Sequence, residues 1–186
     1  MIVPSPKIKH REELETGIGK ILLVEVELDE LQEEVDHTII GIDPGTAHMG
    51  IAVLYNRLVC NRTLLYEIKI KRGATMIDRL LQARNVLVIV ARDCDLFSID
   101  NKCEAVIEGS AFSRHHRQTE MAEQRATLHL WLYDNGVKDV TIKQPNSVRK
   151  QAFGYAKVYA KEVWPMFPEN SAAALGCALS AVYKEK

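Results

Sequence analysis

The sequence has no apolar stretch long enough to cross a membrane, and few cysteines. Its apolar runs stay well below the ~18 residues that a spanning helix needs. The opening stretch, MIVPSPKIKHREELE, lacks the apolar segment of a signal peptide. The 186 residues include four cysteines, with no C-x-x-C pair and no closely spaced Cys/His set. We therefore expect a cytoplasmic protein with reduced thiols, no zinc site and no membrane partner.

Acidic and basic residues nearly balance over the whole chain, but they are unevenly distributed along it. The net charge is −1, yet residues 1–37 hold ten acidic and four basic side chains, a net of −6. Residues 38–186 therefore carry +5, from twenty basic and fifteen acidic groups. An apolar fraction of 47% supports a real core, and we expect an acidic extension at 1–37 followed by one domain at 38–186. A mildly basic domain permits a nucleic-acid partner without proving one.

The segment KILLVEVELDELQEEV in the extension fits two secondary structures. Apolar and acidic residues alternate over 24–29, which is typical of a half-buried strand. Val24, Leu28, Leu31 and Val35 also recur at helical spacing. The pattern does not decide between them, but either apolar face needs a partner in the domain or in a second subunit.

From residue 38 onward, the alternation of patterns predicts an α/β domain. The predicted strands are 38–43, 50–55, 63–70, 104–108 and 140–143. The predicted helices are 75–95, 117–134 and, after Pro145, helices broken near Gly154, Pro165 and Pro168, the last from about Asn170 or Ser171. This order indicates a mixed five-stranded sheet flanked by helices.

Two acidic residues each end a predicted buried strand. The first strand, TIIGID, finishes on Asp43, and the fourth finishes on Glu108. An Asp before Pro-Gly also commonly opens a turn, so Asp43 alone has an ordinary explanation. Ligand sites in such sheets gather at the carboxyl ends of strands. If these two strands are neighbours, the carboxylates face each other and favour a divalent cation between them.

Four sequence elements together resemble a known family. They are IIGIDPGTAHMGIAVL, AVIEGSAF, VTIKQPNSVRKQAFGYAKVYAKEVWPMF and NSAAALGCALSAVY, in this order within residues 38–183. The combination is similar to the RuvC-type Holliday junction resolvases, bacterial and phage nucleases of the RNase H and retroviral-integrase superfamily. The resemblance implies an RNase H-like fold and a crossover junction endodeoxyribonuclease that resolves four-way DNA junctions by paired symmetric nicks.

The resemblance also implies where metal ions bind. Members of the family hold two Mg²⁺ (or Mn²⁺) ions at four positions, which match Asp43, Glu108, Asn170 and Ala173 here. Asn170 keeps a neutral oxygen for a hard cation, whereas Ala173 has no donor atom. We therefore expect poor metal occupancy and a very low cleavage rate, with Glu169 as the nearby acid that could compensate.

Two interpretations of Ala173 stay open. Either the chain is a natural non-cleaving relative, or Ala173 is a laboratory change from the aspartate of an active protein. One Asp at this position would restore the family's Asp-Ala-Leu with every neighbour already fitting, which favours the second interpretation. A relative of the first kind would bind branched DNA without cutting it.

Basic and aromatic residues around the predicted cleft are candidates for DNA contacts. SAFSRHHRQ places a basic cluster at a helix start, where cations are otherwise disfavoured. Phe112 fits either stacking on an unpaired base or a place in the core. Arg149 stands where the family has a lysine, although a solvated helix face is the ordinary explanation for the cations around Gly154. The candidates are Phe112, Arg114, His115, Arg117, Arg149, Lys150, Lys157 and Lys161.

Partners follow from the symmetry of the DNA that the resemblance implies. A four-way junction has approximate two-fold symmetry, so we expect a homodimer formed through the apolar face of helix 117–134. The acidic extension could complete this dimer, shield the basic cleft or dock a helicase-like partner.

A phosphotransferase of the actin and sugar-kinase type shares a Gly-x-Asp-x-Gly-Thr loop. That class needs two such domains, and only ~150 residues follow position 38.

Overall fold

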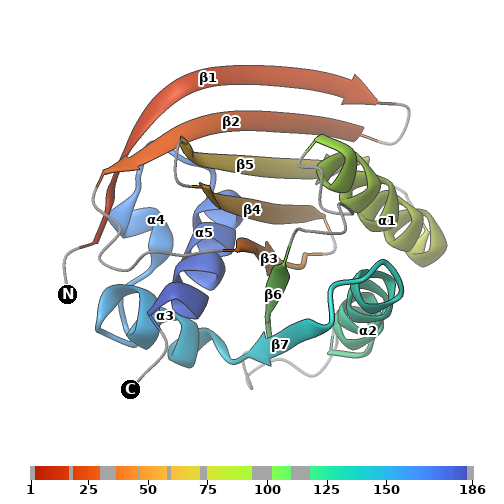
Figure 1. Ribbon diagram of the computed structural model, residues 1–186. Coiled ribbons are helices and arrows are strands. Elements are labelled where there is room, and N and C mark those ends of the chain that lie inside the picture. The colour runs from red at the N-terminus through yellow and green to blue at the C-terminus, as the bar shows by residue number, and fades with distance from the viewer. Residues whose placement is uncertain are drawn as a thin grey trace.

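The computed structural model describes residues 3–16, 19–29, 37–45, 47–57, 60–71, 75–93, 102–109 and 118–183 (Figure 1). The strands are β1 (Ser5–Thr16), β2 (Gly19–Asp29), β3 (Thr38–Asp43), β4 (His48–Arg57), β5 (Cys60–Ile70), β6 (Cys103–Glu108) and β7 (Asp139–Lys143). The helices are α1 (Met76–Asp93), α2 (Gln118–Asp134), α3 (Pro145–Phe153), α4 (Ala160–Val163) and α5 (Glu169–Val182).

The strands form one mixed sheet in the order β1-β2-β5-β4-β3-β6-β7. From β1 to β3 along this order each pair is antiparallel, whereas β6 runs parallel to β3 and β7 runs parallel to β6. The predicted α/β class and mixed sheet are confirmed. The predicted count of five strands is wrong, because the described residues form seven. The two additional strands, β1 and β2, come from the acidic N-terminal segment.

In the N-terminal segment, the strand interpretation of KILLVEVELDELQEEV is confirmed for β2. Val24, Val26 and Leu28 are buried, and β2 pairs antiparallel with β5 over nearly its whole length. Leu31 and Val35, on which the helical interpretation also relied, lie outside the described residues. The predicted boundary at residue 37 stays a prediction, although this hairpin shares the sheet and the core of the later residues.

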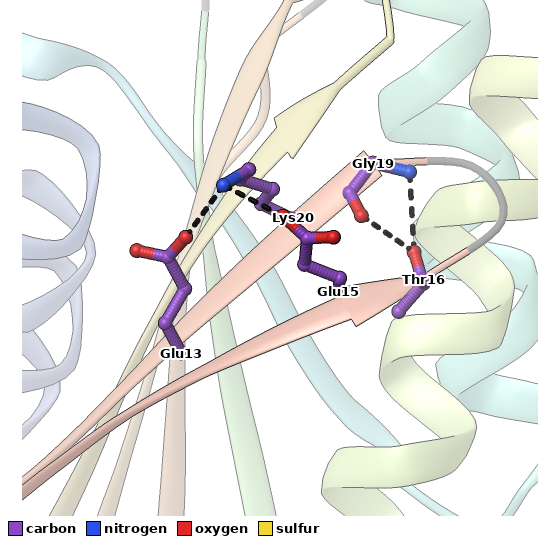
Figure 2. A network of polar contacts seen from close by, with 5 residues as sticks. All are labelled: Glu13, Glu15, Thr16, Gly19 and Lys20. Carbon is purple, nitrogen blue, oxygen red and sulfur yellow. Dashed lines mark hydrogen bonds and ion pairs between the residues drawn. The ribbon is translucent and has the colours of Figure 1, made fainter.

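Polar contacts define the end of the β1–β2 hairpin (Figure 2). Lys20 on β2 pairs with Glu13 and Glu15 on β1, at 2.8 and 2.9 Å. The Thr16 hydroxyl donates to the carbonyl oxygen of Gly19 and accepts the N–H of Gly19, at 3.0 and 3.1 Å. Exposed ion pairs of this kind contribute little stability, so the apolar residues of β2 hold the hairpin on the sheet.

Helices cover both faces of the sheet (Figure 1). α3, α4 and α5 lie against one face, and α1 and α2 lie against the other. Successive side chains of a strand point to opposite faces, so β3 contributes Ile39 to the first layer and Ile40 and Ile42 to the second. β3 is therefore apolar on both faces, as expected of a central strand covered by helices on both sides.

α5 approaches the centre of the sheet closely because both partners are small there. A Cβ added at Gly41 of β3 would lie 2.0 Å from the carbonyl oxygen of Ala174 and 2.5 Å from the nitrogen of Ala178. No side chain fits at such distances, so glycine is required at this point. The close contact places the middle of α5 against β3.

Most predicted elements from residue 38 onward are confirmed within a few residues. α1 confirms the predicted helix as far as Asp93, and residues 94–101 are outside the described part. Cys103 is half-buried and Cys177 is buried, and neither of these two described thiols is part of a disulfide. Within the described ranges, no helix is both long enough and apolar enough to cross a membrane.

Candidate active site

Asp43 and Glu108 lie side by side because β3 and β6 are parallel neighbours. The register pairs Ile42 with Ile107, so the next residue of each strand projects at the same end of the sheet. Their carboxyl groups are hydrogen-bonded to each other. Burial, and after it the charge of Glu108, raise the pKa of Asp43 well above its usual range. A hydrogen bond between two carboxyl groups requires a proton on one of them.

Opposing effects act on the pKa of Glu108. Burial raises the pKa of Glu108, while the hydrogen bond with Asp43 and the nearby guanidinium of Arg149 both act to lower it. Arg149, on α3, lies over the ring of Tyr159, 4.3 Å from the ring centroid. Stacking on an aromatic face limits the freedom of the guanidinium, so a cation with planar, bidentate geometry is held beside the acidic pair.

These groups line one cavity of about 130 Å³. The first five residues of α5 contribute Glu169, Asn170 and Ala173 to its wall. The four predicted metal positions, which are far apart in the sequence, are therefore brought together at one place. Their role as metal ligands stays a prediction.

The oxygen atoms around the cavity fit one hard cation better than two. Asp43 and Glu108 offer carboxylates that would release their shared proton on binding a divalent ion, and Asn170 offers a neutral carbonyl oxygen. Ala173 ends in a methyl group and offers nothing. Among the described residues, no set of three His, Cys, Asp or Glu side chains is arranged to hold a metal ion. The residues present thus suit a single Mg²⁺ or Mn²⁺, and the two ions of the intact family pattern stay a prediction.

The predicted DNA-contact residues divide by location. Phe112, Arg114, His115 and Arg117 lie outside the described residues. Lys150 and Lys157 are exposed, whereas Arg149 and Lys161 line the cavity. Contact with DNA by any of these side chains stays a prediction.

Lys161 is engaged within the protein itself. Its ammonium donates to the carbonyl oxygens of Pro165 and Phe167, at 2.9 and 2.5 Å. These bonds satisfy two of its three donors and fasten the segment that leads into α5. Arg149 is therefore the better placed of the two cavity cations to meet a phosphate oxygen.

Glu67 on β5 is the residue of this region that sequence reasoning missed. Its carboxylate accepts hydrogen bonds from Asn170 Nδ2 and from the backbone N–H of Ser171, both at 2.7 Å. His48 on β4 lies with Nδ1 3.7 Å from Oε1 of Glu67. The sequence feature that could have identified Glu67 is its place as the one acidic residue in the apolar run TLLYEIKI. Its partner Asn170 lies 103 residues away in the sequence, so no local pattern connects the two.

No protein-family model and no curated protein sequence matches the chain. Solved structures do match it. The structure of Thermus thermophilus RuvC aligns with a TM-score of 0.61 at 20% identity, covering 78% of this chain and 94% of that chain. The fold is RuvC-like.

A second RuvC structure supports the same conclusion. T. thermophilus RuvC in complex with a Holliday junction substrate aligns with a TM-score of 0.62 at 19% identity. The alignment covers 79% of this chain and 93% of that chain. At 19–20% sequence identity, this similarity shows the fold alone. It confirms the resemblance to the RuvC-type family at the level of the fold. The Asp-to-Ala interpretation of position 173 stays a hypothesis.

Proposed function

We propose that this protein binds four-way DNA junctions and carries the site of a RuvC-like endonuclease that is impaired at Ala173. The observation that carries the proposal is the hydrogen-bonded pair of Asp43 and Glu108 at adjacent strand ends. Asn170 and position 173 face the same cavity from α5. Burying two carboxylates together is unfavourable unless a proton or a cation is bound between them.

Each residue of the cavity has a distinct part in the proposed reaction. A divalent ion, when bound, lowers the pKa of the attacking water and stabilises the leaving 3′ oxygen. Asp43 and Glu108 would hold this ion, and Asn170 would add a neutral oxygen. Arg149 would bind a phosphate oxygen of the strand to be cut. Without a donor at Ala173, a second ion lacks its ligand, and we expect cleavage to be very slow.

The second candidate function is recognition of branched DNA without cleavage. The methyl group at Ala173 favours it, because the donor set is incomplete in this chain. Both candidates require junction binding that weakens steeply as salt increases, since contacts to phosphates release counterions. They differ in what a restored donor at position 173 would do.

The test compares this chain with Ala173→Asp on a synthetic mobile four-way junction with Mg²⁺ or Mn²⁺. We expect both proteins to bind the junction in a gel shift, and only Ala173→Asp to nick it. Adding Asp43→Asn to Ala173→Asp should abolish nicking and keep binding. Binding by both proteins with nicking by neither would support the non-cleaving alternative. Binding by neither would contradict both candidates.

We also propose that the acting unit is a homodimer. Resolution of a two-fold junction requires two nicks at related positions, which a C2 dimer provides. α2 exposes Leu130 and Tyr133, with exposed fractions of 62% and 48%. A dimer formed through this helix requires exposed apolar side chains of this kind. In the same cleavage assay, symmetric nicks in opposing strands support the dimer, and nicks in one strand alone contradict it.

A further inference from the structure

Asp43, Gly50 and Glu67 form one row across three neighbouring strands. Asp43 pairs with Gly50 between β3 and β4, and Gly50 pairs with Glu67 between β4 and β5. Directly opposite residues project to the same face of a sheet, so the two acids flank the glycine on the face that carries α5. A Cβ at Gly50 would lie 1.9 Å from the carbonyl oxygen of Asn170. The first turn of α5 therefore rests on Gly50, between the two acids.

Glu67 fixes the orientation of Asn170 within this row. Both carboxyl oxygens of Glu67 act as acceptors here, so the amide turns its NH₂ group toward Glu67. The observed bond from Asn170 Nδ2, at 2.7 Å, agrees with this requirement. Because Nδ2 and Oδ1 diverge from the same carbon, Oδ1 is the amide atom left for another partner. Asn170 lines the cavity together with Asp43 and Glu108.

We propose that Glu67 is a positioning residue that presents the carbonyl oxygen of Asn170 to a divalent cation held by Asp43 and Glu108. The proposal rests on the metal site of the proposed function and adds a residue outside its four family positions. Glu67 acts at two points, since it holds both the Asn170 amide and the N–H of Ser171 at the start of α5. Its side chain is only 12% exposed, so water competes weakly for these bonds.

This role also explains why an amide suits position 170. An aspartate in place of Asn170 would put a second carboxylate within hydrogen-bond distance of Glu67, with no donor between them. Two carboxyl groups at this distance lack the donor that the Asn170 amide supplies to Glu67 at 2.7 Å. The acidic group on β5 and the amide on α5 therefore form a complementary pair.

A double-mutant cycle on the binding of Mn²⁺ tests the proposal. The dissociation constant of Mn²⁺ is measured by electron paramagnetic resonance for the unmodified chain, Glu67→Gln, Asn170→Ala and the double variant. Loss of a residue that orients a metal ligand typically weakens affinity by about 10–100-fold. We expect each single variant to bind at least roughly tenfold more weakly, and the double variant to match Asn170→Ala within about twofold. Unchanged affinity in Glu67→Gln, or losses that multiply in the double variant, would overturn the proposal.

Glu67→Asp separates the hydrogen bond from the charge. This variant keeps the carboxylate but is shorter by one methylene, so it should lose the bond to Asn170 and show the same weakened binding as Glu67→Gln. Affinity that stays at the unmodified value in Glu67→Asp would mean that charge alone acts, and the positioning role would be wrong. Thermal unfolding of each variant shows whether it is folded at the temperature of measurement.

The outcomes separate this proposal from the proposed function. Asp43→Asn should abolish Mn²⁺ binding if the metal site exists. If Asp43→Asn abolishes binding and Glu67→Gln leaves it intact, the positioning role is wrong and the metal site stands. If the unmodified chain and Ala173→Asp both bind no Mn²⁺, the metal site is wrong and the role of Glu67 is wrong with it.

Discussion

The contact between α5 and Gly50 leads to a prediction about stability. Replacing Gly50 with alanine would place the new Cβ 1.9 Å from the carbonyl oxygen and 2.2 Å from the carbonyl carbon of Asn170. It would also lie 2.7 Å from the backbone nitrogen of Ser171. All three atoms belong to the backbone of the first turn of α5. No rotation of a side chain can therefore relieve the overlap, and the helix itself has to move.

The size of the effect follows from these distances. Comfortable carbon contacts begin near 3.5 Å, so the first turn of α5 would withdraw from β4 by about 1.5 Å. Overpacking of a core costs about 1–3 kcal/mol or more. Withdrawal would also break both hydrogen bonds to Glu67, at about 1 kcal/mol each. We expect a total loss of roughly 3–5 kcal/mol, which lowers Tm by about 6–20 °C for a chain of this size.

Differential scanning calorimetry of Gly50→Ala against the unmodified chain measures this loss. Gly176→Ala, within α5, is the matched control. Its Cβ would meet the ring of Phe153, at 3.3 and 3.6 Å, and alanine favours a helix over glycine by about 1 kcal/mol. We expect Gly176→Ala to stay within about 1 kcal/mol of the unmodified chain. A Tm of Gly50→Ala within about 2 °C of the unmodified value would refute the close approach of α5 to β4.

Two further predictions concern the acidic pair and the hairpin. In buffer containing a chelator, Asp43→Asn should raise Tm at pH 8 and have little effect near pH 4. Burial and the neighbouring carboxylates raise the pKa of Asp43, so the folded state of the unmodified chain loses stability as pH rises from the ordinary aspartate pKa through the raised one. A difference in Tm that does not change with pH would contradict this sign. Deleting residues 1–36 should abolish cooperative unfolding in calorimetry, because burial of Ile21, Val24, Val26 and Leu28 supplies about 6–12 kcal/mol, as much as a typical domain's whole stability. A folded, monodisperse product would show that the hairpin is dispensable.

The central strands and the acidic pair could be predicted because their signals are local. β3 and β6 are short apolar runs that each end on an acid, and a strand buried on both faces has that pattern. Parallel neighbours align their carboxyl ends, so one assumption about strand order was enough to place Asp43 beside Glu108. The helix boundaries also followed from local residues, such as Gly154, which ends α3 with φ of 80°.

β1 could not be predicted because it is an edge strand. Its sequence, SPKIKHREELET, is exposed along nearly its whole length and carries charges on both faces. Edge strands of natural sheets carry such charges, which discourage pairing with other chains, and so they lose the alternation that identifies a strand. Only the pairing of β1 with β2 defines it, and that pairing depends on tertiary structure.

Glu67 escaped sequence reasoning for a different reason. A single acid in an apolar strand indicates a buried partner, but nothing local says which residue it is. The partner became visible only with the register of β3, β4 and β5 and the close approach of α5 over Gly50. Residues whose role is to hold another residue have no motif of their own, because the chemistry resides in the residue that they hold.

If position 173 departs from a family aspartate, as proposed, the departure concerns chemistry and not the packing of the backbone. Gly41 and Gly50 still admit α5 to the sheet, and Ala173 lies half-buried on the wall of a cavity of about 130 Å³. An aspartate at that position adds a single carboxylate, which a space of this size can hold without displacing the backbone. The cost of Ala173→Asp is therefore electrostatic, since Asp43 already interacts with Glu108, Glu67 and Glu169. A bound divalent cation offsets that cost, so the site and its metal should be gained or lost together.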